Sequence, residues 1–319
     1  MPRPFPFELL APPDPLTLRL PPAAHPFPGV RLLRAVPYGV LDGGRPLELD
    51  LWLPDDVPRP RPVIVFVHGG AWRQGLRDDM GPFMRDPEPG PFARLAAAGF
   101  AVACVDYRLS GEAVFPAQLD DLRTALGWLH ARSGELGTDS SRTVLWGASA
   151  GGHLAALTAL ADPAGTAAVP PVRGCVVWYA PTDLGALAED CPPGRFDPGS
   201  TTSFEALLLG GAPDAQPALV AAASPAKRAG PGSPPFLVLH GTDDTLVPVA
   251  QGRRLAAALR AAAVPVDFRE IEGADHLWVG IEEDRITECF LTSLRFARSV
   301  TAGPVQGGAE DDRQGDGER

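Results

Sequence analysis

The stretch Gly147-Ala-Ser-Ala-Gly151 decides the fold predicted for this chain. The apolar run Thr143–Trp146 comes before it and predicts a buried strand, and the small-residue segment Gly151–Leu160 follows it and predicts a helix. Strand, sharp turn and helix in this order are typical of a nucleophile elbow, which holds a serine under strain and presents its hydroxyl at the carboxyl edge of a sheet. Glycine is needed at both ends because a Cβ there would collide with the neighbouring strand and helix. The alternative is a glycine-rich turn with an idle serine.

The rest of the chain predicts the sheet that such a turn requires. An antiparallel hairpin, Arg31–Tyr38 with Leu47–Leu53, is followed by apolar runs that alternate with segments of helical period. This order predicts an α/β fold with a mostly parallel central sheet and helices on both faces. The later strands are expected at Val63–Val67, Ala101–Val105, Thr143–Trp146, Cys175–Tyr179, Phe236–His240 and Val266–Ile271, and the helices at Pro91–Ala98, Phe115–Leu129, Gly151–Leu160, Val249–Ala262 and Ile281–Arg298.

Shifts in composition mark the boundaries of the domain. Residues 1–30 are rich in proline and are expected to form an irregular arm, and residues 31–300 are expected to form the α/β domain. Within the domain, residues 183–232 are rich in Pro, Gly and Ala and interrupt the alternation. An excursion of this length between central strands predicts a lid-like insertion. The acidic, glycine-rich tail at 301–319 is expected to be disordered.

Charge and cysteine usage narrow the possible partners. The formal net charge of -11 argues against a nucleic-acid partner, because phosphate contact needs a basic surface. No apolar run approaches the ~20 residues of a membrane span, and the amino terminus lacks the pattern of a signal segment. We therefore expect no membrane partner and a cytoplasmic location. The cysteines show no metal-ligand spacing, which predicts reduced thiols and no metal site; they are Cys104, Cys175, Cys191 and Cys289.

Three residues from separate parts of the chain are candidates for a catalytic relay. Ser149 needs a base, and the base needs an orienting acid; in a sheet of this kind both come from loops at the carboxyl ends of strands. His276 follows the last predicted strand and is the expected base. Asp244 follows the strand before it and is the expected acid, with Asp243 left open as the alternative. The other histidines are expected in the arm, at the start of a loop, in helices or at a strand end, namely His25, His68, His130, His153 and His240.

A second loop is expected to supply hydrogen-bond donors. The segment His68-Gly-Gly-Ala-Trp72 leaves the carboxyl end of a predicted strand, and its glycines allow the backbone to approach a ligand closely. We expect the N–H groups of Gly70, Ala71 and Ala150 to form an oxyanion hole. His68 is expected to brace the loop rather than to transfer protons. Three aromatic residues at or near strand ends are candidates to line the substrate pocket, namely Trp72, Tyr107 and Tyr179.

Six motifs, in this order along the chain, resemble the α/β-hydrolase superfamily. They are HGGAW at 68–72, DYRLS at 106–110, FPAQLDDL at 115–122, WGASAGGHLAAL at 146–157, HGTDDTLVP at 240–248 and GADH at 273–276. Within the superfamily, the chain resembles a bacterial esterase and lipase group that includes hormone-sensitive-lipase-like carboxylesterases, feruloyl-esterase-like proteins and kynurenine formamidases. Ala148 stands where many members carry an acidic residue. The HGG loop continues with Ala-Trp instead of a third glycine, which favours the feruloyl-esterase-like and formamidase branch.

The resemblance implies a serine hydrolase that cleaves small acyl or aryl carboxylic esters through an acyl-enzyme intermediate. It implies Ser149 as nucleophile, Asp244 as orienting acid and His276 as base, in the chain order of α/β-hydrolases. It implies no cofactor and a small-molecule ester as the binding partner. One alternative is an arylformamidase that uses the same triad. Another is a non-catalytic binder that keeps the hydrolase pocket. The sequence does not indicate acyl specificity or oligomeric state.

Overall fold

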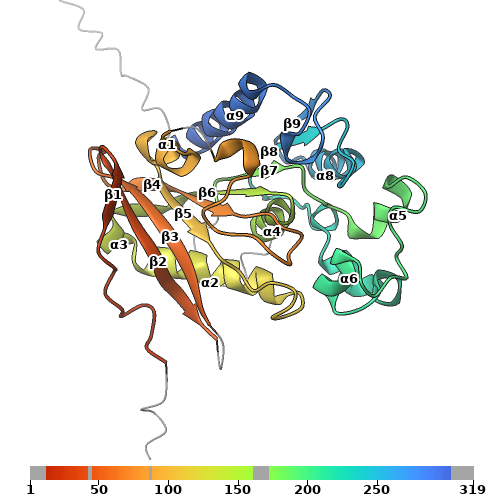
Figure 1. Ribbon diagram of the computed structural model, residues 1–319, viewed down its shortest axis with the longest axis horizontal. Coiled ribbons are helices and arrows are strands. Elements are labelled where there is room, and N and C mark those ends of the chain that lie inside the picture. The colour runs from red at the N-terminus through yellow and green to blue at the C-terminus, as the bar shows by residue number, and fades with distance from the viewer. Residues whose placement is uncertain (1–11, 42–44, 86–87, 161–171, 303–319) are drawn as a thin grey trace, which may run out of the picture.

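One mixed β-sheet runs through the molecule, with helices on both of its faces (Figure 1). The computed structural model describes residues 12–41, 45–85, 88–160 and 172–302. In these residues, nine strands follow the order β1-β2-β3-β5-β4-β6-β7-β8-β9 across the sheet. Their bounds are β1 Ala24–Phe27, β2 Val30–Val40, β3 Pro46–Pro54, β4 Arg61–Val67, β5 Ala101–Val105, β6 Thr138–Ala148, β7 Gly174–Trp178, β8 Phe236–Gly241 and β9 Val266–Ile271.

The sheet is mostly parallel, as the sequence predicts. Every pairing among the strands from β4 to β9 is parallel, whereas β1, β2 and β3 form an antiparallel extension at one side. All residues of β5, β7 and β8 are buried. Their continuous apolar sequences are what a strand covered on both faces requires.

Different helices cover the two faces. Successive residues of β4 point to opposite sides, so Val65 packs in the core under α2, α4 and α8, and Phe66 packs in the core under α1 and α9. Figure 1 shows α1 and α9 above the sheet and α2 below it. The bounds are α1 Pro91–Ala97, α2 Ala117–Ala131, α3 Ser133–Leu136, α4 Ala150–Ala159, α8 Ala250–Ala261 and α9 Glu283–Thr301.

The carboxyl ends of the parallel strands meet at one edge of the sheet. The last residue of β4, Val67, pairs with Gly147 near the end of β6, and the last residues of β8 and β9, Gly241 and Ile271, pair with each other. The loops that leave β4, β6, β7, β8 and β9 therefore open at the same edge. This arrangement brings candidate residues that are distant in sequence into one region.

Residues 183–232, predicted to form a lid-like insertion, fold as a series of short helices. They include α5 Leu187–Asp190, α6 Phe204–Leu209 and α7 Pro217–Ala222, and Figure 1 shows α5 and α6 to one side of the sheet. The side chain of Gln251 in α8 accepts hydrogen bonds from the N–H groups of Thr182 and Asp183 and donates one to Asp190. These contacts fix the start of the insertion against the domain.

The amino-terminal arm differs from the prediction in one respect. Ala24–Phe27 forms β1 and pairs antiparallel with β2, whereas the sequence predicts irregular chain there. Before β1, the carbonyl of Pro15 accepts hydrogen bonds from Trp128 and Arg132 at the end of α2. The arm therefore contacts the carboxyl-terminal end of this helix. The tail predicted to be disordered, residues 301–319, begins inside a helix, because Thr301 is the buried last residue of α9. Residues 303–319 of the tail and residues 1–11 of the arm lie outside the described residues.

Candidate active site

Ser149 lies at a strained turn between β6 and α4. Its φ of 54° and ψ of -125° fall in a region that residues other than glycine rarely adopt. The N–H of Ser149 donates to the carbonyl of Trp178 at 2.8 Å, and its carbonyl accepts from the N–H of His153 at 3.0 Å. These bonds to β7 and α4 hold the turn in the strained conformation that the sequence predicts.

Both glycines beside Ser149 are sterically required. A Cβ on Gly147 would lie 2.2 Å from the carbonyl oxygen of Gly151, and a Cβ on Gly151 would lie 2.1 Å from the carbonyl oxygen of Val67. Both obstacles are backbone atoms, which cannot rotate away as a side chain can. Close packing of α4 against β4 therefore depends on the absence of side chains here.

We expect Gly151→Ala to lower the free energy of unfolding by at least ~3 kcal/mol, because its Cβ would displace the backbone of β4. Gly134→Ala is the matched control, since a Cβ on Gly134 in α3 meets nothing within 4 Å. Its effect should stay within ~1 kcal/mol. Denaturant unfolding of the two variants measures the difference, and equal stabilities would contradict the steric argument.

Ser149, His276 and Asp244 form a continuous chain of hydrogen bonds. The Oγ of Ser149 lies 3.0 Å from Nε2 of His276, and Nδ1 of His276 lies 2.8 Å from Oδ2 of Asp244. An ionised carboxylate only accepts hydrogen bonds, so Nδ1 carries the proton and Nε2 is free to accept the serine hydroxyl. All three residues are 8% exposed, so the chain is largely shielded from water. The structure thus brings the three predicted residues together.

The carboxylate of Asp244 is held from both sides. Its Oδ1 accepts the N–H groups of Leu246 and Val247, at 3.0 and 2.7 Å. Nε2 of His240 donates to the carbonyl of Val247 at 2.8 Å and lies 3.4 Å from Oδ2 of Asp244. Burial raises the pKa of Asp244, but the adjacent imidazoles of His240 and His276 outweigh this effect and lower the pKa to about 2. The alternative acid, Asp243, is exposed and accepts its hydrogen bond from Thr242.

The loop that carries His276 is fixed by contacts that the sequence does not reveal. Oδ1 of Asp275 accepts the N–H of His276 and the N–H of Thr245, both at 2.7 Å, and so joins this loop to the loop of Asp244. The ring of Tyr179 meets the ring of His276 edge to face, with centroids 4.8 Å apart. The ring of Trp278 packs on the same tyrosine at 4.7 Å. Tyr179, predicted to line the pocket, therefore lies directly beside the candidate base.

The loop after β4 passes close to Ser149 in a strained conformation. A Cβ on Gly69 would lie 3.0 Å from the carbonyl oxygen of Ala148 and 3.3 Å from Cβ of Ser149, so a side chain here would be tightly crowded. Gly70, Ala71 and Trp72 have φ angles of 114°, 53° and 56°. Among the described residues, no acceptor pairs with the N–H of Gly70, Ala71 or Ala150. These amides are thus available as donors, as the predicted oxyanion hole requires.

His68 braces the loop, as the sequence predicts. Its Nδ1 donates to the carbonyl of Gly69 at 2.7 Å, and its ring stacks on that of Tyr107, with centroids 4.4 Å apart. The hydroxyl of Tyr107 donates to the carbonyl of His68 at 3.1 Å. Burial lowers the pKa of His68, which keeps the ring neutral. Tyr107, predicted to line the pocket, is fully buried beneath the loop and supports it.

Trp72, the third residue predicted to line the pocket, also turns inward. Its indole N–H donates to Nδ1 of His153 at 3.2 Å, and Nε2 of His153 donates to the carbonyl of Ala223, in the insertion, at 2.6 Å. Trp72 is 2% exposed, because its ring packs in the core. The sequence places His153 in the elbow helix and gives no sign of this bridge, since its partner in the insertion is a backbone carbonyl.

Burial lowers the pKa of His153 to about 4, against a usual value of 6.5. Between these two values the unfolded chain binds a proton that the folded chain does not bind, so stability falls as the pH falls from 6.5 to about 4. We expect this histidine to account for about 3 kcal/mol of that loss. Urea unfolding across this interval should show a shallower pH dependence for His153→Gln than for the wild type, and parallel curves would contradict the prediction.

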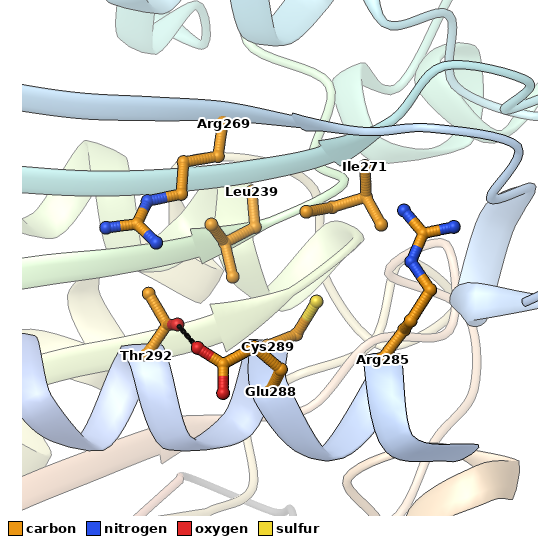
Figure 2. A pocket seen from close by; sticks show the side chains of 7 residues that line it. All are labelled: Leu239, Arg269, Ile271, Arg285, Glu288, Cys289 and Thr292. Carbon is orange, nitrogen blue, oxygen red and sulfur yellow. Dashed lines mark hydrogen bonds between the residues drawn. The ribbon is translucent and has the colours of Figure 1, made fainter. Parts of the chain in front are cut away.

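A hollow lies between the sheet and α9. Figure 2 shows its lining, in which side chains from β8 and β9 face side chains from α9. The strands contribute Leu239, Arg269 and Ile271, and the helix contributes Arg285, Glu288, Cys289 and Thr292. None of them is a predicted site residue.

In the described part of the chain, no helix has both the length and the apolar character that crossing a membrane needs.

Known proteins resemble this chain over most of its length. The family described as BD-FAE matches residues 49–259, which is more than half of the 319 residues. Esterase LipC of Mycobacterium tuberculosis is 33% identical over 249 residues, which cover 74% of this chain and 58% of LipC. Esterase LipQ of the same organism is 34% identical over 251 residues, which cover 76% of this chain and 56% of LipQ. The chain thus spans little more than half the length of these curated relatives.

A solved structure described as a bacterial heroin esterase superimposes on this chain with a TM-score of 0.68 and 29% sequence identity, and the match covers 85% of each chain. Because the match covers most of this chain, whose sheet is mostly parallel with helices on both faces, the predicted α/β-hydrolase fold is confirmed. The chain belongs to the BD-FAE family, within the esterase group of the α/β-hydrolases.

Proposed function

We propose that this protein is a serine esterase that cleaves small acyl or aryl carboxylic esters through an acyl-enzyme intermediate. The observation that carries the proposal is the hydrogen-bonded chain from Ser149 through His276 to Asp244. Such a chain is what activates a serine hydroxyl for attack. The esterase names of LipC and LipQ support the reaction class. This chain covers little more than half the length of LipC and LipQ, and we propose that it hydrolyses esters by itself.

In the proposed reaction, Oγ of Ser149 attacks the ester carbonyl while Nε2 of His276 takes the hydroxyl proton. The carboxylate of Asp244 holds the tautomer of His276 and stabilises the imidazolium that forms. His276 then gives the proton to the leaving alkoxide, and the acyl group stays on Ser149. Water attacks this acyl group with His276 as the base again, which releases the acid and restores the serine.

The proposed oxyanion hole consists of the N–H groups of Gly70, Ala71 and Ala150. They belong to the loop beside Ser149 and to the first turn of α4, and they would donate to the oxygen on which negative charge develops. Losing one donor of this kind typically costs ~2.7–4 kcal/mol of transition-state stabilisation. We propose that Tyr179 and the insertion at 183–232 shape the pocket around the scissile bond, with the insertion acting as a lid.

Parallel turnover of p-nitrophenyl acetate and N-formylkynurenine separates ester hydrolysis from formamide hydrolysis. The esterase names of the relatives do not favour the formamidase alternative, so we expect release of p-nitrophenol and little release of formate. Faster turnover of the formyl amide than of the ester would contradict the proposal. A folded protein that hydrolyses neither compound, nor longer acyl esters of p-nitrophenol, would instead favour the non-catalytic binder.

We infer a cytoplasmic location from the state of the cysteines. All four are unpaired, and Cys104, Cys175 and Cys289 are buried. Unpaired thiols fit a reducing compartment. Cell fractionation should recover the protein with cytoplasmic markers, and recovery in a secreted fraction would contradict this inference.

A further inference from the structure

One buried imidazole connects segments that lie far apart in the sequence. His153 is 0% exposed, and both of its ring nitrogens are hydrogen-bonded, Nδ1 to the indole N–H of Trp72 and Nε2 to the carbonyl of Ala223. An indole N–H only donates and a carbonyl only accepts, so the neutral tautomer with its proton on Nε2 satisfies both partners. In the proposed mechanism His276 transfers the proton of Ser149. His153 does not take part in that transfer, because its two ring nitrogens bond to Trp72 and Ala223.

The segment that His153 holds through Trp72 is strained. Ala71 and Trp72 have left-handed φ angles of 53° and 56°, which side-chain-bearing residues adopt only where surrounding contacts impose them. Two hydrogen bonds hold Trp72 in this conformation, one from Ser110 N–H to its carbonyl at 2.7 Å and one from its indole to His153 at 3.2 Å. Loss of the indole contact would free Trp72 to relax, together with the amides of Gly70 and Ala71.

The other end of the bridge reaches the insertion. Ala223 immediately follows α7 and is fully buried, and its carbonyl lies 2.6 Å from Nε2 of His153. His153 itself lies one turn after Ser149 in α4, where its N–H donates to the carbonyl of Ser149. A single side chain therefore joins the helix of the nucleophile, the loop of the proposed oxyanion donors and the insertion.

We propose that His153 is a positioning residue that ties the oxyanion-forming loop to the insertion, so that the packing of the insertion sets the orientation of the Gly70 and Ala71 amides. This inference rests on the proposed esterase function, since these amides matter only where negative charge develops on a carbonyl oxygen. Contacts between a substrate and the insertion reach the amides through His153.

Three variants separate the two halves of the bridge. Trp72→Phe removes the indole donor and keeps the bond from His153 to Ala223, whereas His153→Leu removes both bonds. His153→Gln keeps one acceptor and one donor on a planar group and should restore most of the activity.

With p-nitrophenyl acetate, we expect Trp72→Phe and His153→Leu to lower kcat ~10–100-fold with KM within ~3-fold, because the lost interaction acts in the transition state. The double variant should lose no more than His153→Leu alone, because the bond that Trp72→Phe removes is already absent in His153→Leu.

Hydrogen exchange tests the link to the insertion directly. In His153→Leu, amide exchange should rise both in residues 69–76 and in residues 217–228. In Trp72→Phe, it should rise in residues 69–76 only. If His153→Leu does not fold, the inference is tested by kcat and amide exchange of Trp72→Phe and by kcat of His153→Gln.

Each other outcome has a definite meaning. Losses of kcat that multiply in the double variant, an effect confined to KM, or increased exchange at only one end of the bridge in His153→Leu would overturn the inference and leave the esterase function intact. Failure of the wild-type protein to hydrolyse any ester would overturn the proposed function instead.

Discussion

Replacing Ser149 with alanine is expected to lower kcat for ester hydrolysis by at least ~10⁴-fold. The hydroxyl is the proposed attacking group, and it lies 3.0 Å from Nε2 of His276, its one hydrogen-bond partner among the described residues. Without it no acyl-enzyme forms, and residual catalysis comes from substrate binding and the oxyanion donors alone. The measurement is single-turnover and steady-state hydrolysis of p-nitrophenyl acetate.

The fold should survive this substitution, because alanine removes one atom and leaves the backbone bonds of residue 149 in place. Ser299→Ala, at an exposed position on α9, is the matched control and should retain wild-type kcat. Near-normal turnover by a folded Ser149→Ala protein would show that another group performs the attack.

Replacing Asp244 with asparagine is expected to lower kcat by about 10⁴-fold without unfolding the protein. Oδ1 of Asp244 accepts two backbone N–H groups, from Leu246 and Val247, so the asparagine carbonyl will occupy that position. Its NH₂ group then faces Nδ1 of His276 and forces that nitrogen to accept. The proton moves to Nε2 of His276, which can no longer take the proton of Ser149.

Asp243→Asn is the matched control for this effect. Asp243 is the neighbouring acid, is exposed, and bonds to the hydroxyl of Thr242 rather than to a histidine. We expect its kcat to stay within ~2-fold of the wild type, as for most surface substitutions. If Asp243→Asn caused the large loss and Asp244→Asn did not, the assignment of the orienting acid would be wrong.

The sheet could be predicted because its strands are unusually uniform. Segments such as Val63–Val67 and Ala101–Val105 are continuous apolar runs, and their boundaries agree with β4 and β5 to within two residues. The helices of the insertion could not be predicted, because α5, α6 and α7 have 4, 6 and 6 residues and are too short to show a period. Strand β1 escaped prediction because its residues, Ala24–Phe27, are mostly exposed and carry no alternating pattern.

The relay could be predicted because each member lies in a loop whose place follows from the order of strands. Both Asp243 and Asp244 follow β8, and the structure places the expected acid, Asp244, within hydrogen-bond distance of His276. The supporting contacts could not be predicted, because their partners are backbone groups or distant rings. Asp275 bonds to two N–H groups, and His153 bonds to the carbonyl of Ala223. The bond from the indole of Trp72 to His153 is a contact of the same kind, because it joins residues 81 positions apart in the sequence.

Covalent labelling tests the central claim most directly, because it depends on the activated serine and not on the choice of substrate. The protein is treated with a fluorophosphonate, digested, and mapped by peptide mass spectrometry. We predict one adduct, on Ser149, that forms readily in the wild type and in Asp243→Asn, slowly in Asp244→Asn, and not at all in Ser149→Ala. An adduct on a different residue, or an unlabelled Ser149 in a preparation that hydrolyses esters, would contradict the account.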